Sequence, residues 1–438
     1  MPAEVPDTVP GARRMGSGVA EPEHYRLPER LDPYWAGAWT ASPGGSAVAW
    51  GGRHWERRLA AAADPEARAA LVAAERQAVA AALSARRRRG ALFLLAALQS
   101  WGALRFAQAA VLTGEQAVRG RRGPVPALEE AGLVQIGRVV TVGRGVPGLR
   151  LLRLDGCGPF ERLDEMISFR EWMAATGGLP WGRALPADRH SVLSAELSLR
   201  AAESSPLAAI LGERQCNLAE FFGAPAGKTR SDALWVRSDG LCIHVELVAS
   251  ADRRAQAKLV HRIEMVRADP TRSNVVLFVG AASPSERRRE RIHKDLRDAM
   301  VRATAHSPDA ADTDVAQRVA WIRWEDWFPS PGVMTAWPRT LRVHSPSGPP
   351  GARWETLDLA DPFAVPAGHP LPGRLGGYQR LAALPPWQRR ASEDDFVEEL
   401  IAAAGMESPY LRLEGRPFGR TDGKRAVVDL PAGPAAVR

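Results

Sequence analysis

The sequence predicts a mixed α/β protein, and two stretches with different periodicity carry this prediction. Residues 90–155 contain short segments with helical spacing of apolar residues, followed by two apolar strands. Residues 190–328 instead alternate helix-like segments with strand-like apolar runs. The chain has 438 residues. Because this exceeds one ordinary domain of about 150 residues, we expect two or three domains.

Composition excludes several classes of protein. Hydrophobic residues make up 45% and charged residues 25% of the chain, so global disorder is excluded. The apolar run 91–98 is far shorter than the roughly 18 residues of a membrane-spanning helix, and residues 1–10 lack the pattern of a secretory signal. The cysteines fit neither a disulfide framework nor a CxxC metal motif, since they lie far apart: Cys157, Cys216 and Cys242. We therefore expect a cytoplasmic protein with reduced thiols and no membrane partner.

The charge balance favours polyanionic partners. Lys and Arg number 58 against 50 Asp and Glu, which gives a net charge of +8. Phosphates attract such a surface, because Lys and Arg side chains that bind them release condensed counterions. Nucleic acid is therefore the default partner, although an arginine-rich composition is also typical of a GC-rich genome. The pattern of residues 90–155, described below, is what favours double-stranded DNA.

The N-terminal part divides into two segments. Residues 1–58 are expected to form a flexible leader and a tryptophan-rich segment, for which no motif is evident. Residues 59–89 are expected to form an alanine-rich helix, since Arg86–Arg89 would complement its C-terminal dipole and Gly90 would end it. These arginines are equally compatible with a solvated helix end and with a phosphate contact.

Residues 90–155 are expected to form a winged helix-turn-helix. The expected helices are 91–104, 106–112 and a short recognition helix at 115–122, and the expected strands are 133–142 and 149–154. Because Pro124 and Pro126 are unfavourable inside a helix, the recognition helix should end before them, and a separate turn should follow. Such a unit reads DNA with its third helix and its strand hairpin. The side chains expected to bind DNA are Arg119, Arg121, Arg122 and Arg144.

The hairpin loop GRGVPG (143–148) also matches the pattern GxGxxG. A dinucleotide-binding loop needs a helix after its last glycine, so that the helix N-terminus faces the pyrophosphate. Here residues 149–154 continue as an apolar strand, which favours a glycine-rich wing with Arg144 at its tip.

A connector and a second unit follow. Residues 156–189 form the connector, which is rich in Pro and Gly. The elements expected in 190–328 are helices at 190–203, 252–267 and 285–303 and strands at 232–237, 241–249, 274–280 and 318–323. Their order resembles the PD-(D/E)XK core of restriction-endonuclease-like proteins. Residues 329–438 are expected to form a Pro/Gly-rich appendage with one helix at 392–404.

The first two strands of this unit are expected to form a hairpin that brings two acidic residues together. The loop 238–240, with Gly240 in the left-handed conformation, is a common three-residue hairpin type. In that register Asp232 lies directly opposite Glu246, with Cβ atoms about 5 Å apart. The apolar side chains of both strands then share the other face, whereas a two-residue loop would turn Asp232 towards it.

The chemistry that this core implies is metal-assisted hydrolysis of a phosphodiester. Asp232 and Glu246 would bind Mg²⁺ or Mn²⁺, which polarises the phosphate and acidifies a water molecule. The resemblance places a lysine two residues after the second acid, where this chain has Val248. Lys258 on the following helix is the candidate replacement for that catalytic lysine, with Lys228 as a weaker one. Glu196 is a candidate further metal ligand, although an exposed carboxylate without a metal is the more common role of such a residue.

Two further features have both a functional and a structural interpretation. His244 shares the strand face of Glu246, but a lone histidine is more often a hydrogen-bonded structural residue. The basic helix carries a run of cations that either face solvent or bind phosphates. The second role is slightly favoured for these side chains: Arg287, Arg288, Arg289, Arg291 and Lys294.

Several segments after the expected winged helix together resemble the replication-relaxation family of plasmids and integrative conjugative elements. They are HSVLSAEL (190–197), RSDALWVRSDGLCIHVELVAS (230–250), RRAQAKLVHRIEMV (253–266), NVVLFVG (274–280) and VAWIRWEDWF (319–328). The resemblance covers about residues 90–328 and implies a role in plasmid replication, DNA relaxation or transfer, with other plasmid-processing proteins as partners. It assigns the acidic positions to Asp232 and Glu246, while Ser231 stands where the family usually has proline.

Two functions from different classes are compatible with these patterns. The first is a DNA-binding protein of a mobile element that acts as a metal-dependent DNA nickase. The second is a non-catalytic DNA-binding accessory protein or transcriptional regulator that keeps the nuclease fold as a scaffold. A nuclease requires Asp232 and Glu246 within reach of one cation and an ammonium group nearby. The direction of the Lys258 side chain therefore distinguishes the two functions.

Overall fold

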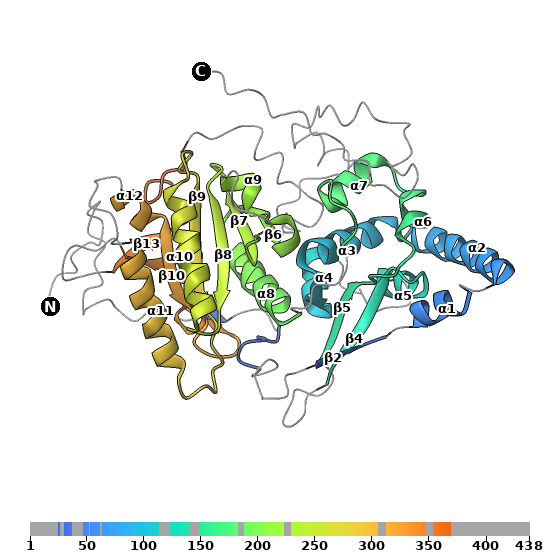
Figure 1. Cartoon of the computed structure of the whole chain (residues 1–438), viewed down its shortest axis with the longest axis horizontal. Helices are drawn as coiled ribbons and strands as arrows, with labels where there is room; N and C mark the ends of the chain where they lie inside the picture. Colours follow the sequence, from blue (N-terminus) through green and yellow to red (C-terminus); the bar gives the residue numbers. More distant parts are fainter. Residues whose placement is uncertain are drawn as a thin grey trace, which may run out of the picture.

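The computed structural model describes residues 25–26, 30–36, 47–51, 53–61, 64–113, 123–140, 149–182, 188–222, 229–304, 312–346 and 354–368. Within these residues the chain is a mixed α/β protein with a larger and a smaller sheet (Figure 1). A short strand pair, β1 (Tyr25–Arg26) with β11 (Val333–Met334), joins the N-terminal segment to a much later part of the chain.

The larger sheet has seven strands and a parallel centre. Their order is β13 (Glu355–Asp358), β12 (Arg342–Ser345), β10 (Val319–Arg323), β9 (Asn274–Gly280), β8 (Cys242–Val248), β7 (Ala233–Arg237) and β6 (Leu207–Gly212). Strands β8, β9 and β10 are parallel neighbours, and the other pairs are antiparallel. Parallel neighbours need crossover helices, and these are α10 (Arg253–Arg267), α11 (Arg289–Thr304) and α12 (Asp312–Gln317).

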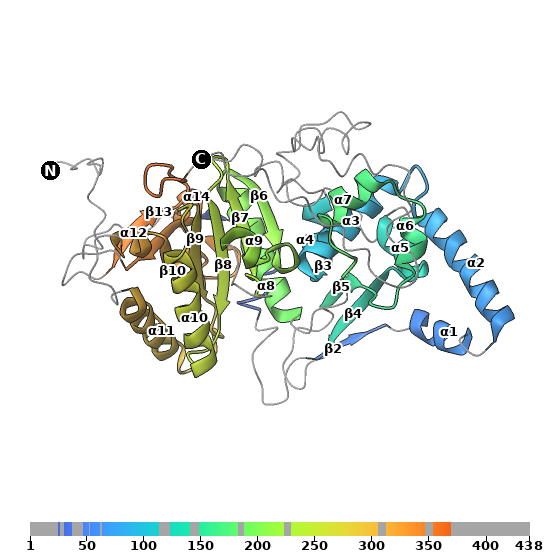
Figure 2. The same cartoon turned by 45° about the horizontal axis from the view of Figure 1, so that its top comes forward.

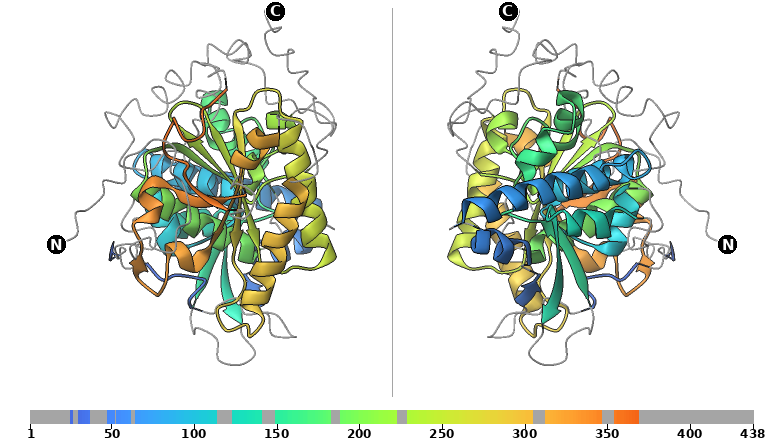
Figure 3. Two further views of the ribbon diagram at one scale, coloured as in Figure 1. Left: turned by 90° about the vertical axis from the view of Figure 1, so that its left-hand side faces the viewer. Right: turned by 90° about the vertical axis from the view of Figure 1, so that its right-hand side faces the viewer.

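Different helices cover the two faces of the larger sheet (Figure 3). Helices α10 and α11 pack against one face, where Leu259 and Trp321 belong to one buried apolar cluster. Helix α8 (Asp188–Ser204) packs against the other face, where Nε1 of Trp235 donates a 2.7 Å hydrogen bond to Oγ of Ser198. Because side chains alternate along a strand, Glu246 on β8 points to the α10 face.

The smaller sheet is antiparallel and carries the N-terminal helices (Figure 2). Its strands run in the order β2 (Ala47–Trp50), β4 (Val134–Val140), β5 (Arg150–Leu154) and β3 (Ala103–Arg105). The accompanying helices are α1 (Arg53–Ala61), α2 (Pro65–Ala82), α3 (Arg88–Trp101), α4 (Phe106–Thr113), α5 (Pro124–Glu130), α6 (Phe160–Asp164) and α7 (Phe169–Thr176).

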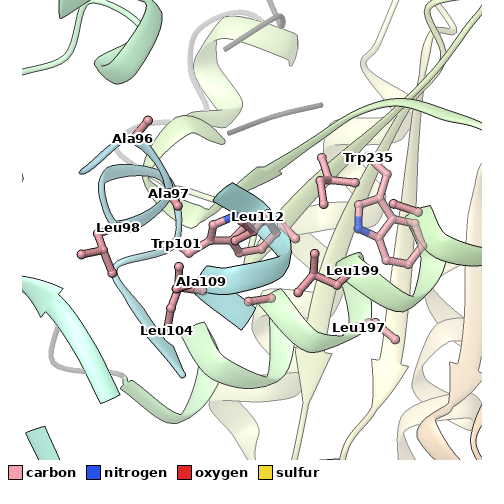
Figure 4. Close-up of a cluster of buried hydrophobic side chains, with 14 of the residues drawn as sticks. Ala96, Ala97, Leu98, Trp101, Leu104, Ala109, Leu112, Leu197, Leu199 and Trp235 are labelled. Carbon is pink, nitrogen blue, oxygen red and sulfur yellow. The ribbon is translucent and has the colours of Figure 1, made fainter. Parts of the chain in front are cut away.

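One buried apolar cluster runs through both parts of the molecule (Figure 4). Leu98 on α3 and Leu112 on α4 belong to it, together with Leu197 on α8 and Trp235 on β7. Since burial of apolar surface contributes about 25 cal/mol per Å², this shared core holds the smaller sheet and its helices against the larger sheet.

The prediction of a single helix at 59–89 is wrong. The chain forms α1 and α2, and Asp64 begins the second helix by accepting a hydrogen bond from the N–H of Glu66 at 2.9 Å, with Pro65 in the first turn. The arginine run 86–89 also has a different place than expected, since α3 begins at Arg88.

Two other local expectations are corrected in the same way. The separate turn expected after the recognition helix is instead helix α5, which begins at Pro124, because the first helical position needs no N–H donor. The connector expected at 156–189 contains α6 and α7, and Ser168 caps α7 through a reciprocal capping box with Glu171.

The chain beyond residue 328 contributes more structure than an appendage. Strands β12 and β13 extend the larger sheet at its edge, and α14 (Trp337–Thr340) lies between β11 and β12 in sequence. The helix expected at 392–404, the recognition helix at 115–122 and the wing loop at 143–148 all lie outside the described residues.

The segment 30–36, which belongs to the expected tryptophan-rich segment, precedes the first helices and is largely buried, whereas the leader expected at 1–21 lies outside the described residues. Within the stretches that the structure describes, every helix is too short or too polar to span a membrane.

Candidate carboxylate and lysine site

The hairpin of β7 and β8 has the register that the sequence predicts. Ala233 pairs with Val245, and Gly240 turns the chain with a φ of 92°, which suits glycine because it has no Cβ. The same register extended by one residue places Asp232 opposite Glu246, as the turn type and the apolar alternation indicate.

Backbone contacts fix the orientation of the Asp232 carboxylate. The N–H of Asp232 donates to the carbonyl of Val245 at 3.0 Å, and Oδ2 of Asp232 accepts from the N–H of Leu247 at 2.7 Å. The other oxygen, Oδ1, lies 3.9 Å from Nζ of Lys258. The hairpin therefore turns this carboxylate oxygen towards α10.

Lys258 joins the two acids from the neighbouring helix. Its ammonium forms an ion pair with Oε2 of Glu246 and lies beside Asp232, while 40% of the side chain stays exposed. Burial alone would lower the pKa of Lys258, but the carboxylates of Glu246 and Asp232 outweigh it and raise the pKa. The ammonium therefore stays charged at neutral pH and can be reached from solvent.

A second cation, Arg262, binds the deeper side of Glu246. Its Nε donates to Oε1 of Glu246 at 2.6 Å, and its Nη2 donates to the carbonyl of Arg230 at 2.9 Å. Burial raises the pKa of the fully buried Glu246, and the charges of Lys258 and Arg262 offset this only in part. The sequence analysis did not identify Arg262, although it lies one helical turn after Lys258 on the same face.

The donor set fits Mg²⁺ or Mn²⁺ bound through two carboxylates. Mg²⁺ keeps several of its waters and binds proteins through one or two carboxylates together with substrate phosphates. Within the described part of the chain, no group of three or more His, Cys, Asp or Glu side chains could hold a metal ion. If Mg²⁺ or Mn²⁺ binds here, its protein ligands would be the carboxylate oxygens that face Lys258, namely Oδ1 of Asp232 and Oε2 of Glu246, and Lys258 would have to give up its ion pair with Glu246. Water or phosphate oxygens would complete the coordination shell.

Two further ionisable residues border this site. Burial raises the pKa of Glu213, in the short helix η1 (Glu213–Gln215), and the nearby charge of Asp232 raises it further. Burial lowers the pKa of His190, which also interacts with Asp232. No motif signals either residue in the sequence, because both are remote from the hairpin along the chain.

His244 is a hydrogen-bonded structural residue and does not belong to the carboxylate and lysine site. Its ring nitrogens lie 3.2 Å from Oγ of Ser231 and 3.1 Å from Oδ1 of Asn274, and the residue is fully buried. Phe221 packs edge-on against the ring. This hydrogen bonding anchors the residue before Asp232 and so supports the hairpin.

Glu196 is not a ligand at this site. It is fully buried, and Oε1 accepts hydrogen bonds from Arg30 at 2.8 Å and from Arg200 at 2.9 Å. Its other oxygen accepts from Gln108 on α4. The expected role as a further metal ligand is therefore wrong, because both carboxylate oxygens serve a different buried network.

The position usually held by a catalytic lysine has become part of the core. Val248 is buried and packs in the apolar cluster beneath α10 and α11. The residues expected to bind DNA lie outside the described part of the chain: Arg119, Arg121, Arg122 and Arg144.

The fold and the site together define only a broad class, a mixed α/β protein with a buried carboxylate pair bridged by a lysine. No protein-family model, no curated protein and no solved structure matches this chain.

Proposed function

We propose that this chain is a DNA-binding protein of a mobile element, acting in plasmid replication, relaxation or transfer, and that its larger sheet carries a metal-dependent DNA-nicking site. The observation that carries the nicking proposal is the approach of one ammonium group, that of Lys258, to the carboxylates of both Asp232 and Glu246. The mobile-element assignment has its support in the sequence resemblance to the replication-relaxation family.

The arrangement of the smaller sheet supports DNA binding. Helix α3, strand β3, helices α4 and α5, and strands β4 and β5 follow one another in the chain, with β5 paired to both β3 and β4. This order is compatible with a winged helix-turn-helix, although the expected recognition helix at 115–122 lies outside the described residues. Such a unit reads the major groove with its third helix and its hairpin. We therefore assign duplex DNA as the partner and a PD-(D/E)XK-like core as the fold of the larger sheet.

Each residue of the site has a defined task in this proposal. Asp232 and Glu246 hold the cation, which when bound polarises the phosphate and lowers the pKa of a water molecule. Arg262 keeps Glu246 oriented from the buried side. Lys258, which is partly exposed, stabilises the negative charge that develops on the phosphate oxygens.

Supercoiled plasmid in Mg²⁺ or Mn²⁺ provides the test. We expect the wild type to convert it to open circles, and Glu246→Gln and Lys258→Gln to slow this by at least about 100-fold, since a preorganised charged group contributes that much to such a reaction. Glu264→Gln and Arg57→Gln are the matched controls, because both residues are exposed, Glu264 on α10 and Arg57 on α1, and neither belongs to the proposed site or to the basic run before α11. Gel electrophoresis of the plasmid topoisomers measures the rate.

Equal nicking by the wild type and Glu246→Gln would contradict the nicking proposal. Metal-independent cleavage would contradict it as well, because the proposal assigns activation of the water to the bound cation.

A second function has one specific observation in its favour. Lys258 and Arg262 together neutralise the buried Glu246, and Val248 replaces the usual lysine, so the site also suits a non-catalytic accessory protein or transcriptional regulator. A salt-sensitive shift of DNA without metal-dependent cleavage would favour this function.

A further inference from the structure

The loops that follow β8 and β9 lie side by side at the edge of the sheet next to the candidate site. The N–H of Ala281 donates to the carbonyl of Val248 at 2.9 Å, which joins the two strand ends directly. Helix α10 begins after the first loop and α11 after the second, and the two helices run next to each other (Figure 3). Ligands of parallel sheets commonly bind outside these carboxyl ends.

A stripe of cations leads from the buried site to this edge along α10. Arg262, Lys258 and Arg254 are spaced four residues apart and so lie on one helix face. Their exposure rises towards the start of the helix, since Arg262 is buried, Lys258 is partly exposed and Arg254 is exposed. Arg253 is exposed beside Arg254.

The neighbouring loop carries a second pair of arginines. Arg287 and Arg288 are exposed just before α11. Unlike Arg289, which forms an ion pair with Glu325 at 3.2 Å, neither forms an ion pair with a carboxylate in the described stretches.

Arg253 and Arg254 are likewise without an ion pair among the described residues. The acid closest to them in the chain, Asp252, accepts a 2.8 Å hydrogen bond from the N–H of Ala255 and thereby caps α10. Four positive charges at this edge therefore remain available for an external anion.

We propose that a DNA duplex lies across the carboxyl ends of β8 and β9, with its phosphates bound by Arg253, Arg254, Arg287 and Arg288. This inference rests on the proposed function, because it positions a phosphodiester beside Lys258. Duplex DNA fits better than a small anion, since the arginines come from the first turn of α10 and from the loop before α11 and form a track and not a closed pocket. The ends of β4 and β5 next to the wing loop face the same side of the molecule (Figure 1), so one duplex can contact both units.

Fluorescence anisotropy with a short labelled duplex in EDTA tests this track without any cleavage. We compare Arg253→Gln/Arg254→Gln and Arg287→Gln/Arg288→Gln with a control pair, Arg57→Gln/Arg68→Gln, which lies on α1 and α2 at the opposite end of the molecule (Figure 1). Each phosphate contact contributes about 0.9 to the slope of log K against log salt. We expect each track pair to reduce that slope by about 1.8 and to weaken binding at least about tenfold, and the control pair to change neither.

The possible outcomes separate this inference from the proposed function. Track variants that bind with the wild-type slope would overturn the inference, even if the wild type nicks plasmid. Weaker binding by both track pairs without any nicking by the wild type would support the track and contradict the nickase. No binding by the wild type at low salt would overturn both. Equal melting temperatures of the variants and the wild type exclude misfolding, because all six substituted side chains are exposed.

Discussion

Replacing Glu196 by alanine is expected to lower the free energy of unfolding by about 3–5 kcal/mol. The substitution leaves Arg30 and Arg200 without their shared carboxylate, and both arginines are almost completely buried. Arg30 keeps Glu203 and Arg200 keeps Asp32 as partners. The buried Nε donor of each arginine loses its acceptor, however, and an unsatisfied donor of a charged group inside a protein is costly. Urea unfolding followed by circular dichroism at neutral pH measures the change.

Glu203→Ala is the matched control for this prediction. Glu203 lies on the same helix and binds Arg30 through both oxygens, at 2.7 and 2.9 Å, but its side chain is 15% exposed. Arg30 keeps Glu196 as a partner in this variant, so we expect a smaller loss than for Glu196→Ala. Equal losses in the two variants would show that the shared carboxylate has no special role.

The network around Glu196 also fixes the two parts of the molecule relative to each other. Arg200 on α8 binds Asp32 of the N-terminal segment at 2.7 Å, and Asp32 in turn accepts a 3.2 Å hydrogen bond from Nε1 of Trp324. Gln108 on α4 adds the helices of the smaller sheet through its bond to Glu196. Hydrogen bonds and ion pairs are directional, whereas apolar contacts are not. The network therefore specifies one relative arrangement of the two parts, where the apolar core alone would be compatible with several.

The hairpin site could be predicted from the sequence because its determinants are local. A three-residue loop with Gly240 sets the register, and alternation of apolar residues selects the buried face. Lys258 follows nine residues after the second strand ends at its expected boundary, residue 249, so the next helix brings it back over the sheet. In contrast, Glu196 meets Arg30, which is 166 residues away in the chain, and no local pattern contains that information.

The errors in the fold have equally local causes. Asp64 and Pro65 are a helix start inside an alanine-rich stretch, where strong helix propensity suggested one long helix. Strand β13 has only four residues and lies at the edge of the sheet, where one side is unpaired and a continuous apolar run is not needed. Short edge strands therefore resemble loops in the sequence.

Acidification from pH 7 to pH 5 is expected to destabilise the protein strongly through three buried or partly buried histidines. Burial is the first cause that lowers the pKa of His244, His293 and His344 from 6.5 to about 4 in each case. Between these values the unfolded chain binds more protons than the folded one, so the free energy of unfolding falls as the pH falls. Each neutral histidine contributes its full stabilisation above pH 6.5, and this contribution is lost as the pH falls towards 4. At pH 5 the loss is about 2 kcal/mol of unfolding free energy per histidine.

Single variants assign this loss to individual rings. We expect His244→Gln and His293→Gln each to flatten the difference in unfolding free energy between pH 7 and pH 5 by about 2 kcal/mol, whatever their effect at pH 7. His261→Gln is the control, since this histidine is exposed on α10. Glu246 acts in the opposite direction, because burial raises its pKa and its contribution is therefore lost as the pH rises. All three variants keep Glu246, so its contribution cancels when their pH dependences are compared. If His244→Gln has the same pH dependence as the wild type, the folded chain already tolerates a charged ring at this position, and the prediction is wrong.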